Sequence, residues 1–306
     1  MANETVKMKA GYVALIGRPN VGKSTLINAF LDQKIAAVSP KPQTTRRRQL
    51  GILTRPEAQL VFVDTPGIHK AQHKLGDYMN DEAMSSLTDA DVALWLICAD
   101  EELTNEDRLI AEKLGAIRKL PPVIIALSKV DNVDAATVEK RKKEAVELFP
   151  ARDVLEISSP QKKGLEELLQ ALLKYVPEGE PFFDEDTVTD YYEKDIAAEL
   201  IRESALYFLR DEVPHCLAVR IDEYKERGEK GAFIEATYFV ERDSQKGIVI
   251  GQGGEMLKKI GTRARQEIEK MSGREVFLSL RVKVNKNWRN SPDALHLLGY
   301  EKESDK

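Results

Sequence analysis

Short apolar runs alternate with amphipathic, helix-like segments along the first half of the chain. Several of these runs are continuously apolar, as expected for strands that are buried on both faces of a sheet. We expect strands at 12–16, 49–53, 60–63, 92–99, 123–127 and 154–157, and helices at 23–31, 76–87, 105–114, 135–148 and 165–175. This alternation favours a mostly parallel sheet with helices on both faces. Ligands bind such sheets at the carboxyl ends of the strands.

The pattern changes near Pro177. The stretch 177–190 is acidic and contains prolines, so we interpret it as a linker. Beyond it we expect a helix at 196–209, strands at 216–221 and 233–240, a short helix, a helix at 255–271 and a strand at 276–284. The sequence therefore predicts two domains, at 1–176 and 191–306, joined by 177–190.

The first predicted strand runs into a glycine-rich loop. Residues Gly17–Ser24 read G-x-x-x-x-G-K-[ST], the phosphate-binding P-loop, and they stand between a strand and a helix as the motif requires. Backbone N–H groups and the helix dipole attract phosphate there. Lys23, expected as a surface-loop charge, faces the β and γ phosphates, and Ser24 offers a hydroxyl to Mg²⁺. The alternative is a chance glycine turn. Nucleotide contacts are expected from Gly17, Asn20, Val21, Gly22, Lys23, Ser24 and Thr25.

Two later segments are suited to a metal and γ-phosphate site. Thr44 and Thr45 lie in a polar loop, where a threonine can complete the Mg²⁺ shell when a γ-phosphate is present. A plain polar loop with a basic cluster is the alternative. Asp64 ends a strand, where P-loop enzymes place a Mg²⁺ partner. Gly67 lets a γ-phosphate approach its backbone N–H closely, since it has no side chain. The alternative is a simple turn, because D-T-P-G is also a good turn sequence. We expect Ser24, Thr45 and Asp64 at the metal, and Lys23, Thr45, Asp64 and Gly67 in catalysis.

Two further strand ends are suited to reading a guanine base. Asp131 can accept hydrogen bonds from guanine N1–H and N2–H₂, while the stem of Lys129, which follows Ser128, packs along the base. Ser158 and Ser159 follow the next strand and can supply a backbone N–H to guanine O6. Each motif is weak alone, and their order after the P-loop strengthens both.

A second glycine loop lies in the C-terminal half, between two predicted helices. Such a G-x-x-G loop lets the backbone of single-stranded nucleic acid approach closely and clamps about four nucleotides. Lysine and arginine side chains beside it can neutralise phosphates. A glycine-rich helix cap is the alternative. RNA contacts are expected from Lys246, Ile250, Gly251, Gln252, Gly253, Gly254, Lys258, Lys259 and Arg263.

The charge of the chain is unevenly distributed. The net charge is -5, yet twelve Lys or Arg residues stand against five Asp or Glu residues between Arg242 and Arg289. A basic segment in an acidic protein suggests a local polyanion site, with a solvated face as the alternative.

The remaining composition is that of an ordinary globular protein, with 42% apolar residues. The two cysteines lack metal or disulfide spacing, as in cytosolic proteins. We expect no signal peptide, and no apolar run approaches the ~18 residues that span a membrane.

Together these features resemble the bacterial Era GTPases. The resemblance covers about residues 11–300 and is most specific at 17–24, 43–46, 64–67 and 247–254, and the segment 288–300 resembles the family's C-terminal extension. It implies an α/β P-loop GTPase domain followed by an α+β type II KH domain. It further implies a GTP-hydrolysing, Mg²⁺-dependent switch in 30S subunit assembly that binds single-stranded RNA near the 3′ end of 16S rRNA. The family is also described as peripherally associated with the cell membrane, for which this sequence contains no recognisable device. We expect a cytoplasmic location.

The chain departs from the family pattern in its base-reading motifs. N-K-x-D and S-A-x are usual, whereas Ser128 replaces the asparagine and Ser159 the alanine. We expect Ser128 to lose bonding to guanine N7 and to the P-loop, which lowers affinity more than it changes base identity.

Ile68 stands where many GTPases carry a glutamine that positions water, so intrinsic hydrolysis is expected to be slow. Asn20 occupies a P-loop position where, in some relatives, an asparagine helps to bind K⁺ near the phosphates, so we expect K⁺ to accelerate hydrolysis. An ordinary P-loop asparagine is the alternative. Two functions stay open: a turning-over GTPase whose state controls RNA binding, and an RNA-binding assembly factor that uses GTP mainly as a structural ligand.

Overall fold

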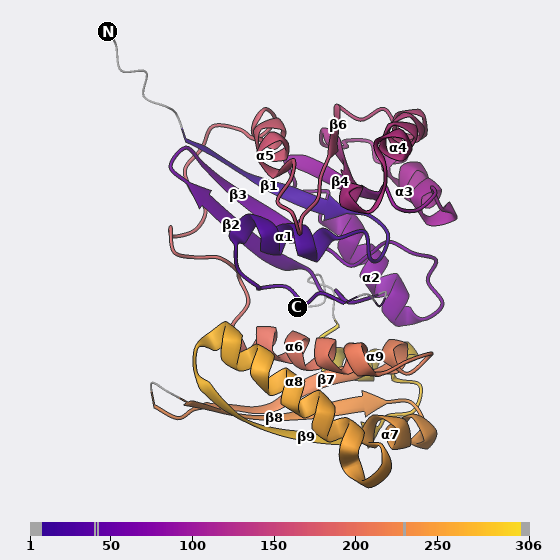
Figure 1. Ribbon diagram of the computed structural model, residues 1–306, viewed down its shortest axis with the longest axis vertical. Coiled ribbons are helices and arrows are strands. Elements are labelled where there is room, and N and C mark those ends of the chain that lie inside the picture. Colours follow the sequence, from indigo (N-terminus) through magenta and orange to yellow (C-terminus); the bar gives the residue numbers. More distant parts are fainter. Residues whose placement is uncertain (1–7, 40, 42, 229–230, 301–306) are drawn as a thin grey trace. The chain divides into compact units, whose positions relative to one another are not determined.

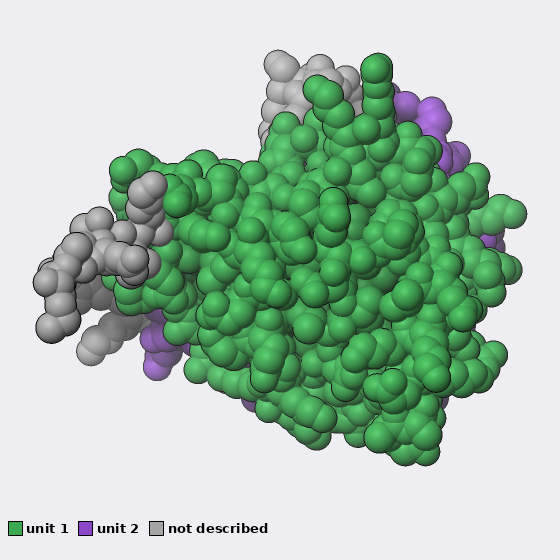
Figure 2. Space-filling model, turned by 90° about the horizontal axis from the view of Figure 1, so that it is seen from above, with its two compact units in different colours: residues 1–33, 45–70, 79–190 green, residues 34–44, 71–78, 191–306 purple. Residues whose placement is uncertain are grey.

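The computed structural model describes residues 8–39, 41, 43–228 and 231–300, and its chain divides into two compact units (Figures 1 and 2). The first unit consists of residues 1–33, 45–70 and 79–190, and the second of residues 34–44, 71–78 and 191–306. Two short segments of the N-terminal half, 34–44 and 71–78, are therefore grouped with the C-terminal half.

The first unit contains a six-stranded sheet in the order β2-β3-β1-β4-β5-β6. Its strands are β1 (Lys9–Ile16), β2 (Gln49–Arg55), β3 (Ala58–Asp64), β4 (Val92–Cys98), β5 (Val123–Ser128) and β6 (Asp153–Glu156). β2 is antiparallel to β3, and all other neighbours are parallel. The predicted mostly parallel sheet is confirmed.

Helices cover both faces of this sheet (Figure 1). They are α1 (Lys23–Leu31), α2 (Lys74–Ser85), α3 (Asn105–Gly115), α4 (Ala135–Leu148) and α5 (Leu165–Leu173). On one face a buried cluster joins Trp95 of β4, which is 0% exposed, to side chains of α2, α3 and α4. On the other face Phe30 of α1 stacks on Phe62 of β3, with ring centroids 5.0 Å apart.

The predicted linker 177–190 is hydrogen-bonded along the first unit. The buried amide of Gln59 accepts bonds from the N–H groups of Phe182 and Phe183 and donates to the Phe183 carbonyl. The N–H of Ile52 donates to the carbonyl of Val188 at 2.9 Å. The segment is therefore a tethered surface strap and not a free spacer, because it satisfies polar groups of β2 and β3.

The second unit combines a three-stranded sheet with helices. The strands β7 (Ala218–Glu226), β8 (Gly231–Val240) and β9 (Glu275–Val284) lie in that order, with β7 antiparallel and β9 parallel to β8. The helices are α6 (Glu193–Phe208), α7 (Asp243–Ile250), α8 (Glu255–Ser272) and α9 (Pro292–Leu297). The core cluster contains Ile201 of α6, Ile234 of β8 and Ile260 of α8, so these helices cover one face of the sheet.

The C-terminal segment packs within the second unit. Trp288 is 0% exposed, and its indole N–H donates to the Cys216 carbonyl at 2.9 Å. The ring of Tyr300 stacks against it, with centroids 6.1 Å apart. Of the helices in the described part of the chain, none is long and apolar enough to cross a membrane.

Candidate nucleotide and RNA sites

The P-loop joins β1 to α1, and Lys23 is its most buried charge. Lys23 is 6% exposed, and its Nζ donates to the carbonyls of Gly17 at 3.0 Å and Arg18 at 3.2 Å. Burial lowers the pKa of Lys23 to about 8, against a weaker opposing effect of the Asp64 charge. The expectation of a surface charge is therefore wrong, because the ammonium folds back under the loop.

Three oxygens meet where the metal was expected. The Ser24 hydroxyl lies 2.9 Å from the Thr45 hydroxyl and donates to Asp64 Oδ2 at 2.7 Å. Thr45 donates to the same Asp64 oxygen at 3.2 Å. β3 places Asp64 directly opposite Leu15 of β1, so the carboxylate stands beside the P-loop. The three side chains predicted as metal ligands thus come together from three separate segments of the first unit.

Gly67 lies against the backbone of the P-loop. A Cβ at Gly67 would stand 2.4 Å from the Pro19 nitrogen, so no other residue fits without displacing one of the two loops. The next residue, Ile68, donates its N–H to the Gly17 carbonyl at 3.1 Å and is 0% exposed in the core. Its side chain is therefore turned away from any position from which it could orient water.

Other predicted contacts lie outside this oxygen cluster. The Thr44 hydroxyl donates to the Lys41 carbonyl at 2.8 Å, within the segment grouped with the second unit. Asn20 is exposed and has a left-handed backbone with φ of 65°, at the tip of the P-loop. Thr45, and not Thr44, is thus the threonine that joins Ser24 and Asp64.

Ser128 ties the base-reading motif to the P-loop. Its hydroxyl donates to the Val21 carbonyl at 2.7 Å and lies 3.3 Å from the Ile97 carbonyl. The expected loss of bonding between residue 128 and the P-loop is therefore wrong, because a serine at this depth, 3% exposed, reaches the loop directly.

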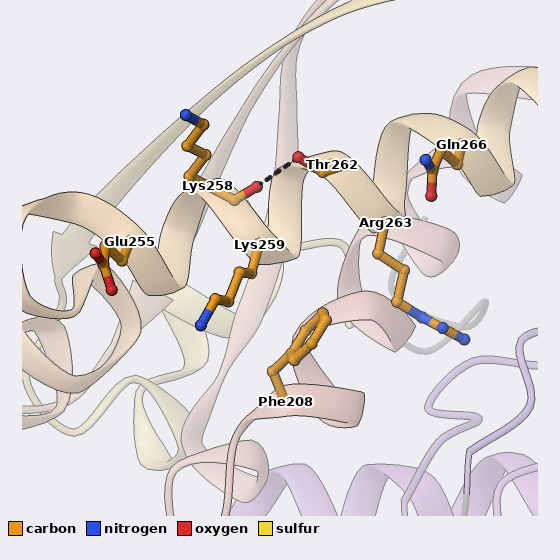
Figure 3. A pocket seen from close by; sticks show the side chains of 7 residues that line it. All are labelled: Phe208, Glu255, Lys258, Lys259, Thr262, Arg263 and Gln266. Atoms are coloured by element: carbon orange, nitrogen blue, oxygen red, sulfur yellow. Dashed lines mark hydrogen bonds between the residues drawn. The ribbon is translucent and has the colours of Figure 1, made fainter.

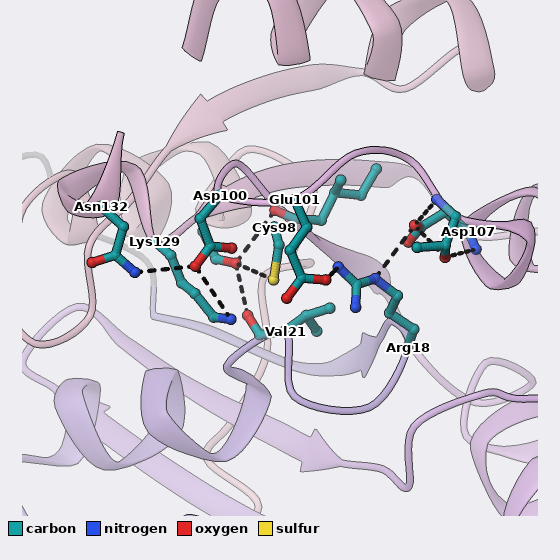
Figure 4. Close-up of polar contacts among 11 residues, drawn as sticks. Arg18, Val21, Cys98, Asp100, Glu101, Asp107, Lys129 and Asn132 are labelled. Atoms are coloured by element: carbon teal, nitrogen blue, oxygen red, sulfur yellow. Dashed lines mark hydrogen bonds and ion pairs between the residues drawn. The ribbon is translucent and has the colours of Figure 1, made fainter. Parts of the chain in front are cut away.

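The rest of this motif opens to solvent beside β4. Lys129 has a left-handed backbone, and its Nζ lies 3.6 Å from Asp100 Oδ2, which also accepts a bond from Asn132 at 3.1 Å (Figure 4). Asp131 is exposed, and no described residue bonds its carboxylate. The sequence analysis did not identify Asp100 or Asn132. Asp100 could have been found, because it follows the end of a strand, as the other predicted motifs do.

The two serines after β6 differ in their backbone N–H groups. The Ser158 N–H donates to Lys163 and is thus occupied, while Ser158 and Ser159 are both buried. In the described part of the chain the Ser159 N–H has no acceptor. Of the two predicted serines, Ser159 is therefore the one whose N–H is available to a base.

Arg18 was also missed by the sequence reasoning. Its guanidinium pairs with Glu101 at 2.5 Å and lies 3.4 Å from Asp107, which is part of the N-terminal cap of α3 (Figure 4). Arg18 thus anchors the first turn of the P-loop to α3. The sequence shows that Arg18 lies inside the P-loop motif. It does not show the acidic partners of Arg18, because they lie some eighty residues away in the chain.

Cys98, Asp100 and Glu101 form a second group of potential metal ligands, with ligand atoms within 4.8 Å of one another. Burial raises the pKa of the Cys98 thiol. A thiol binds metal as the thiolate, so this set is a poor metal site at neutral pH.

The G-x-x-G loop joins α7 to α8 in a conformation that depends on glycine. Gly251, Gly253 and Gly254 have φ angles of 74°, 58° and 84°. A Cβ on Gly253 or Gly254 would meet no atom within 4 Å, so the outer side of the loop is open. Gln252 and Gly253 are exposed, and such a surface admits another backbone.

The predicted basic residues lie on both helices that flank the loop. Lys258 and Lys259 are exposed on the first two turns of α8, and Lys246 and Ile250 are half-buried on α7. Arg263 lies over the Tyr207 ring, 4.1 Å from its centroid. The set predicted for RNA therefore comes from α7, the glycine loop and the first half of α8.

Comparisons with known proteins agree with this geometry. A family described as a 50S ribosome-binding GTPase matches residues 12–129, and the KH domain family matches residues 212–289. GTPase Era of Clostridium kluyveri is 46% identical over 96% of this chain and 100% of its own length. The chain belongs to the Era family of GTPases.

Solved Era structures are also similar to this chain over nearly its whole length. A crystal structure of Era in complex with MgGDPNP and nucleotides 1506–1542 of 16S ribosomal RNA superposes with a TM-score of 0.91 at 42% identity, over 96% of this chain and 100% of that one. A variant of Aquifex aeolicus Era bound to GDP and AlF₄⁻ gives a TM-score of 0.90 at 40% identity, with the same coverage. The GTPase and type II KH architecture expected from the sequence is confirmed.

Proposed function

We propose that this protein is a GTP-hydrolysing switch that binds single-stranded RNA near the 3′ end of 16S rRNA and assists assembly of the 30S ribosomal subunit. The observation that carries the proposal is the meeting of Ser24, Thr45 and Asp64 oxygens beside Lys23. Era crystallised with MgGDPNP and a 16S rRNA fragment supports both halves of it.

The three side chains suit Mg²⁺. Two hydroxyls and one carboxylate within 3.2 Å of one another form a set of hard oxygen donors, which Mg²⁺ prefers. Ser24 and Asp64 would hold the ion with either nucleotide, and Thr45 would join when a γ-phosphate is present. When bound, Mg²⁺ neutralises charge that develops on the phosphate oxygens.

The chain's own groups supply the rest of the phosphate site. Lys23 exchanges its bonds to the Gly17 and Arg18 carbonyls for phosphate oxygens, and the Gly67 N–H is the γ-phosphate donor. Because Ile68 is in the core, water must be oriented by another group, so intrinsic hydrolysis is slow. We propose that K⁺ held near Asn20 compensates, and equal single-turnover rates in K⁺ and Na⁺ would remove that proposal.

A second function rests on the same isoleucine. If no group replaces the missing glutamine, GTP is mainly a structural ligand and the protein is an RNA-binding assembly factor with little turnover. The two functions predict the same binding and differ in rate.

Single-turnover GTP hydrolysis, with and without an oligonucleotide of the 16S rRNA 3′ end, tests the proposal. We expect slow basal hydrolysis that RNA accelerates, and no acceleration in a variant with aspartates at 252 and 253. Lys23→Ala supplies the blank for contaminating activity. If hydrolysis stays at the level of the Lys23→Ala variant with RNA and K⁺ present, the GTPase switch is contradicted. The second function, in which GTP is a structural ligand, would then be supported.

Cytoplasmic location, association with the 30S subunit and peripheral contact with the cell membrane complete the proposal. They rest on the family description. Quantitative sedimentation with purified 30S particles, and with vesicles, separates the two partners.

A further inference from the structure

A hollow of about 690 Å³ lies between α8 and the end of α6 (Figure 3). Its lining comes from α8 and from the last residue of α6. The lining residues are Phe208, Glu255, Lys258, Lys259, Thr262, Arg263 and Gln266. Its volume falls in the range of small-molecule sites.

The hollow is basic. Lys258 and Lys259 form no ion pair with any described residue, and Glu255 is the only acid in the lining. The nearest acid to Arg263 is Glu203 at 3.9 Å, whose carboxylate is already held by Lys34 at 2.9 Å. Lys258 and Lys259 therefore face solvent without an ion-pair partner among the described residues, whereas Arg263 is half-buried beside Glu203. This excess of positive charge attracts a polyanion.

An aromatic surface lies beside these charges. Lys259 and Arg263, one turn apart on α8, line the hollow together with Phe208 (Figure 3). The Arg263 guanidinium is directed away from the Phe208 ring and lies over the Tyr207 ring, 4.1 Å from its centroid. Tyr207 is 59% exposed and packs edge-on against Phe208, with centroids 5.0 Å apart. An aromatic face flanked by cations is the combination on which nucleobases stack while their phosphates are neutralised.

The lining of the hollow begins at Glu255, the residue that follows the predicted RNA clamp in the chain. α8 begins at Glu255, directly after Gly254, and a rise of about 1.5 Å per residue places Lys259 and Arg263 roughly 6 and 12 Å from the helix start. The clamp accounts for about four nucleotides. A strand leaving the loop along α8 therefore reaches Phe208 next.

We propose that this hollow is a nucleotide subsite outside the clamp, in which one further base of the same RNA strand stacks on Phe208. Lys259 and Arg263 hold the phosphates on either side of that base. The proposal rests on the proposed RNA binding by the second unit and adds to it the place and the chemistry of a fifth or sixth nucleotide.

Fluorescence anisotropy with single-stranded RNAs tests the subsite. The probes are an eight-nucleotide RNA of the 16S rRNA 3′ end, the four-nucleotide core that binds most tightly, and eight-nucleotide RNAs with one abasic position each. Phe208→Leu keeps an apolar side chain for packing, and Lys259→Ala removes one charge. Lys270→Ala, an exposed lysine in the last turn of α8 outside the hollow, is the matched control.

We expect Phe208→Leu to weaken the eight-nucleotide RNA about 5- to 100-fold and to leave the four-nucleotide core unchanged. At one of the positions, an abasic site should lower the RNA affinity of the wild type by a similar factor. The same abasic RNA should bind Phe208→Leu almost as tightly as the intact RNA does. Lys259→Ala should weaken both RNAs, because Lys259 is also among the predicted clamp contacts, and the longer RNA more; Lys270→Ala should weaken neither.

Equal loss of both RNAs in Phe208→Leu, or wild-type binding of the longer RNA by that variant, would overturn the subsite. Failure of the wild type to bind either RNA would instead overturn the proposed RNA binding, and the subsite with it. A variant with aspartates at 252 and 253 separates these cases, since it should lose both RNAs.

Discussion

The nucleotide site and the RNA loop are built in opposite ways. Around the P-loop, side chains are buried and already bonded to one another: Ser24 to Asp64, Ser128 to Val21 and Lys23 to loop carbonyls. In the loop from Gly251 to Gly254 the backbone conformation is the main feature, and the open side carries no such bonds among described residues.

The difference reflects the ligands. A triphosphate with a metal ion is compact, and its charges require donors fixed at several strand ends at once. A single RNA strand is long and flexible, so a loop that admits its backbone, beside a basic helix, suffices. Substitutions in the first site should therefore disturb neighbours, whereas those in the second should act on RNA alone.

The largest expected effect is that of Lys23→Ala. Its ammonium should face two phosphate groups, and two charge-assisted bonds of about 1.5–3 kcal/mol each correspond to more than about 100-fold in GTP affinity. Titration of labelled GTP, with circular dichroism as the folding control, measures it. Retained affinity in a folded variant would contradict the P-loop assignment.

The second variant carries Gln252→Asp together with Gly253→Asp. Two added charges and a Cβ at a φ of 58° should abolish single-stranded RNA binding and leave GTP affinity unchanged. Gly247→Ala, where a Cβ meets nothing within 4 Å, is the matched control. Normal RNA binding by the double variant would make the loop a helix cap only.

A smaller change is expected from Asp131→Asn. The exposed carboxylate should accept two bonds from guanine, and its loss should weaken GDP about 10- to 100-fold. Xanthine, whose C2 oxygen can accept from an amide, should then be preferred. Titration with GDP, ADP and XDP decides, and an unaltered guanine preference would mean that the base is read elsewhere.

Proton linkage at Lys23 should be weaker still. Its pKa of about 8 lies below the ordinary value of 10.5, so the folded protein without phosphate has fewer protons than the unfolded chain between these pH values. The free energy of unfolding should therefore rise with pH across that window, with the full cost of burying the charge present below pH 8.

Nucleotide binding should reverse this shift, because phosphates favour the ammonium. GDP affinity should fall above pH 8, at most about tenfold per pH unit, with proton uptake visible by calorimetry in two buffers. Lys23→Arg, which stays charged, should remove the dependence. A GDP affinity of the wild type that does not change with pH would show that Lys23 stays charged across this pH range.

The smallest change concerns Ser128→Ala. It leaves the Val21 carbonyl without its 2.7 Å bond, which costs about 0.5–1.5 kcal/mol, or roughly three- to tenfold in GDP affinity. The preference for GTP over ATP should not change, because Asp131 is intact. A variant equal to wild type would show that the link between the base motif and the P-loop adds nothing.

The fold and most site positions could be predicted because both follow local rules. Continuous apolar runs marked the parallel strands, and α1 and α4 begin and end where the pattern placed them. The pairing of Arg18 with Asp107 and the depth of Lys23 could not be predicted, since both depend on which distant segments meet. For the same reason composition predicted a linker at 177–190 but not the bonds by which Gln59 holds its backbone.

The burial of Trp95 and Trp288 has a practical consequence. They are the two tryptophans of the chain, one in each unit, and both are 0% exposed. Their emission should shift to longer wavelengths only when the surrounding core opens. Replacing either one by phenylalanine therefore leaves a single optical reporter, with which the melting of the GTPase unit and of the KH unit can be followed separately in the intact chain.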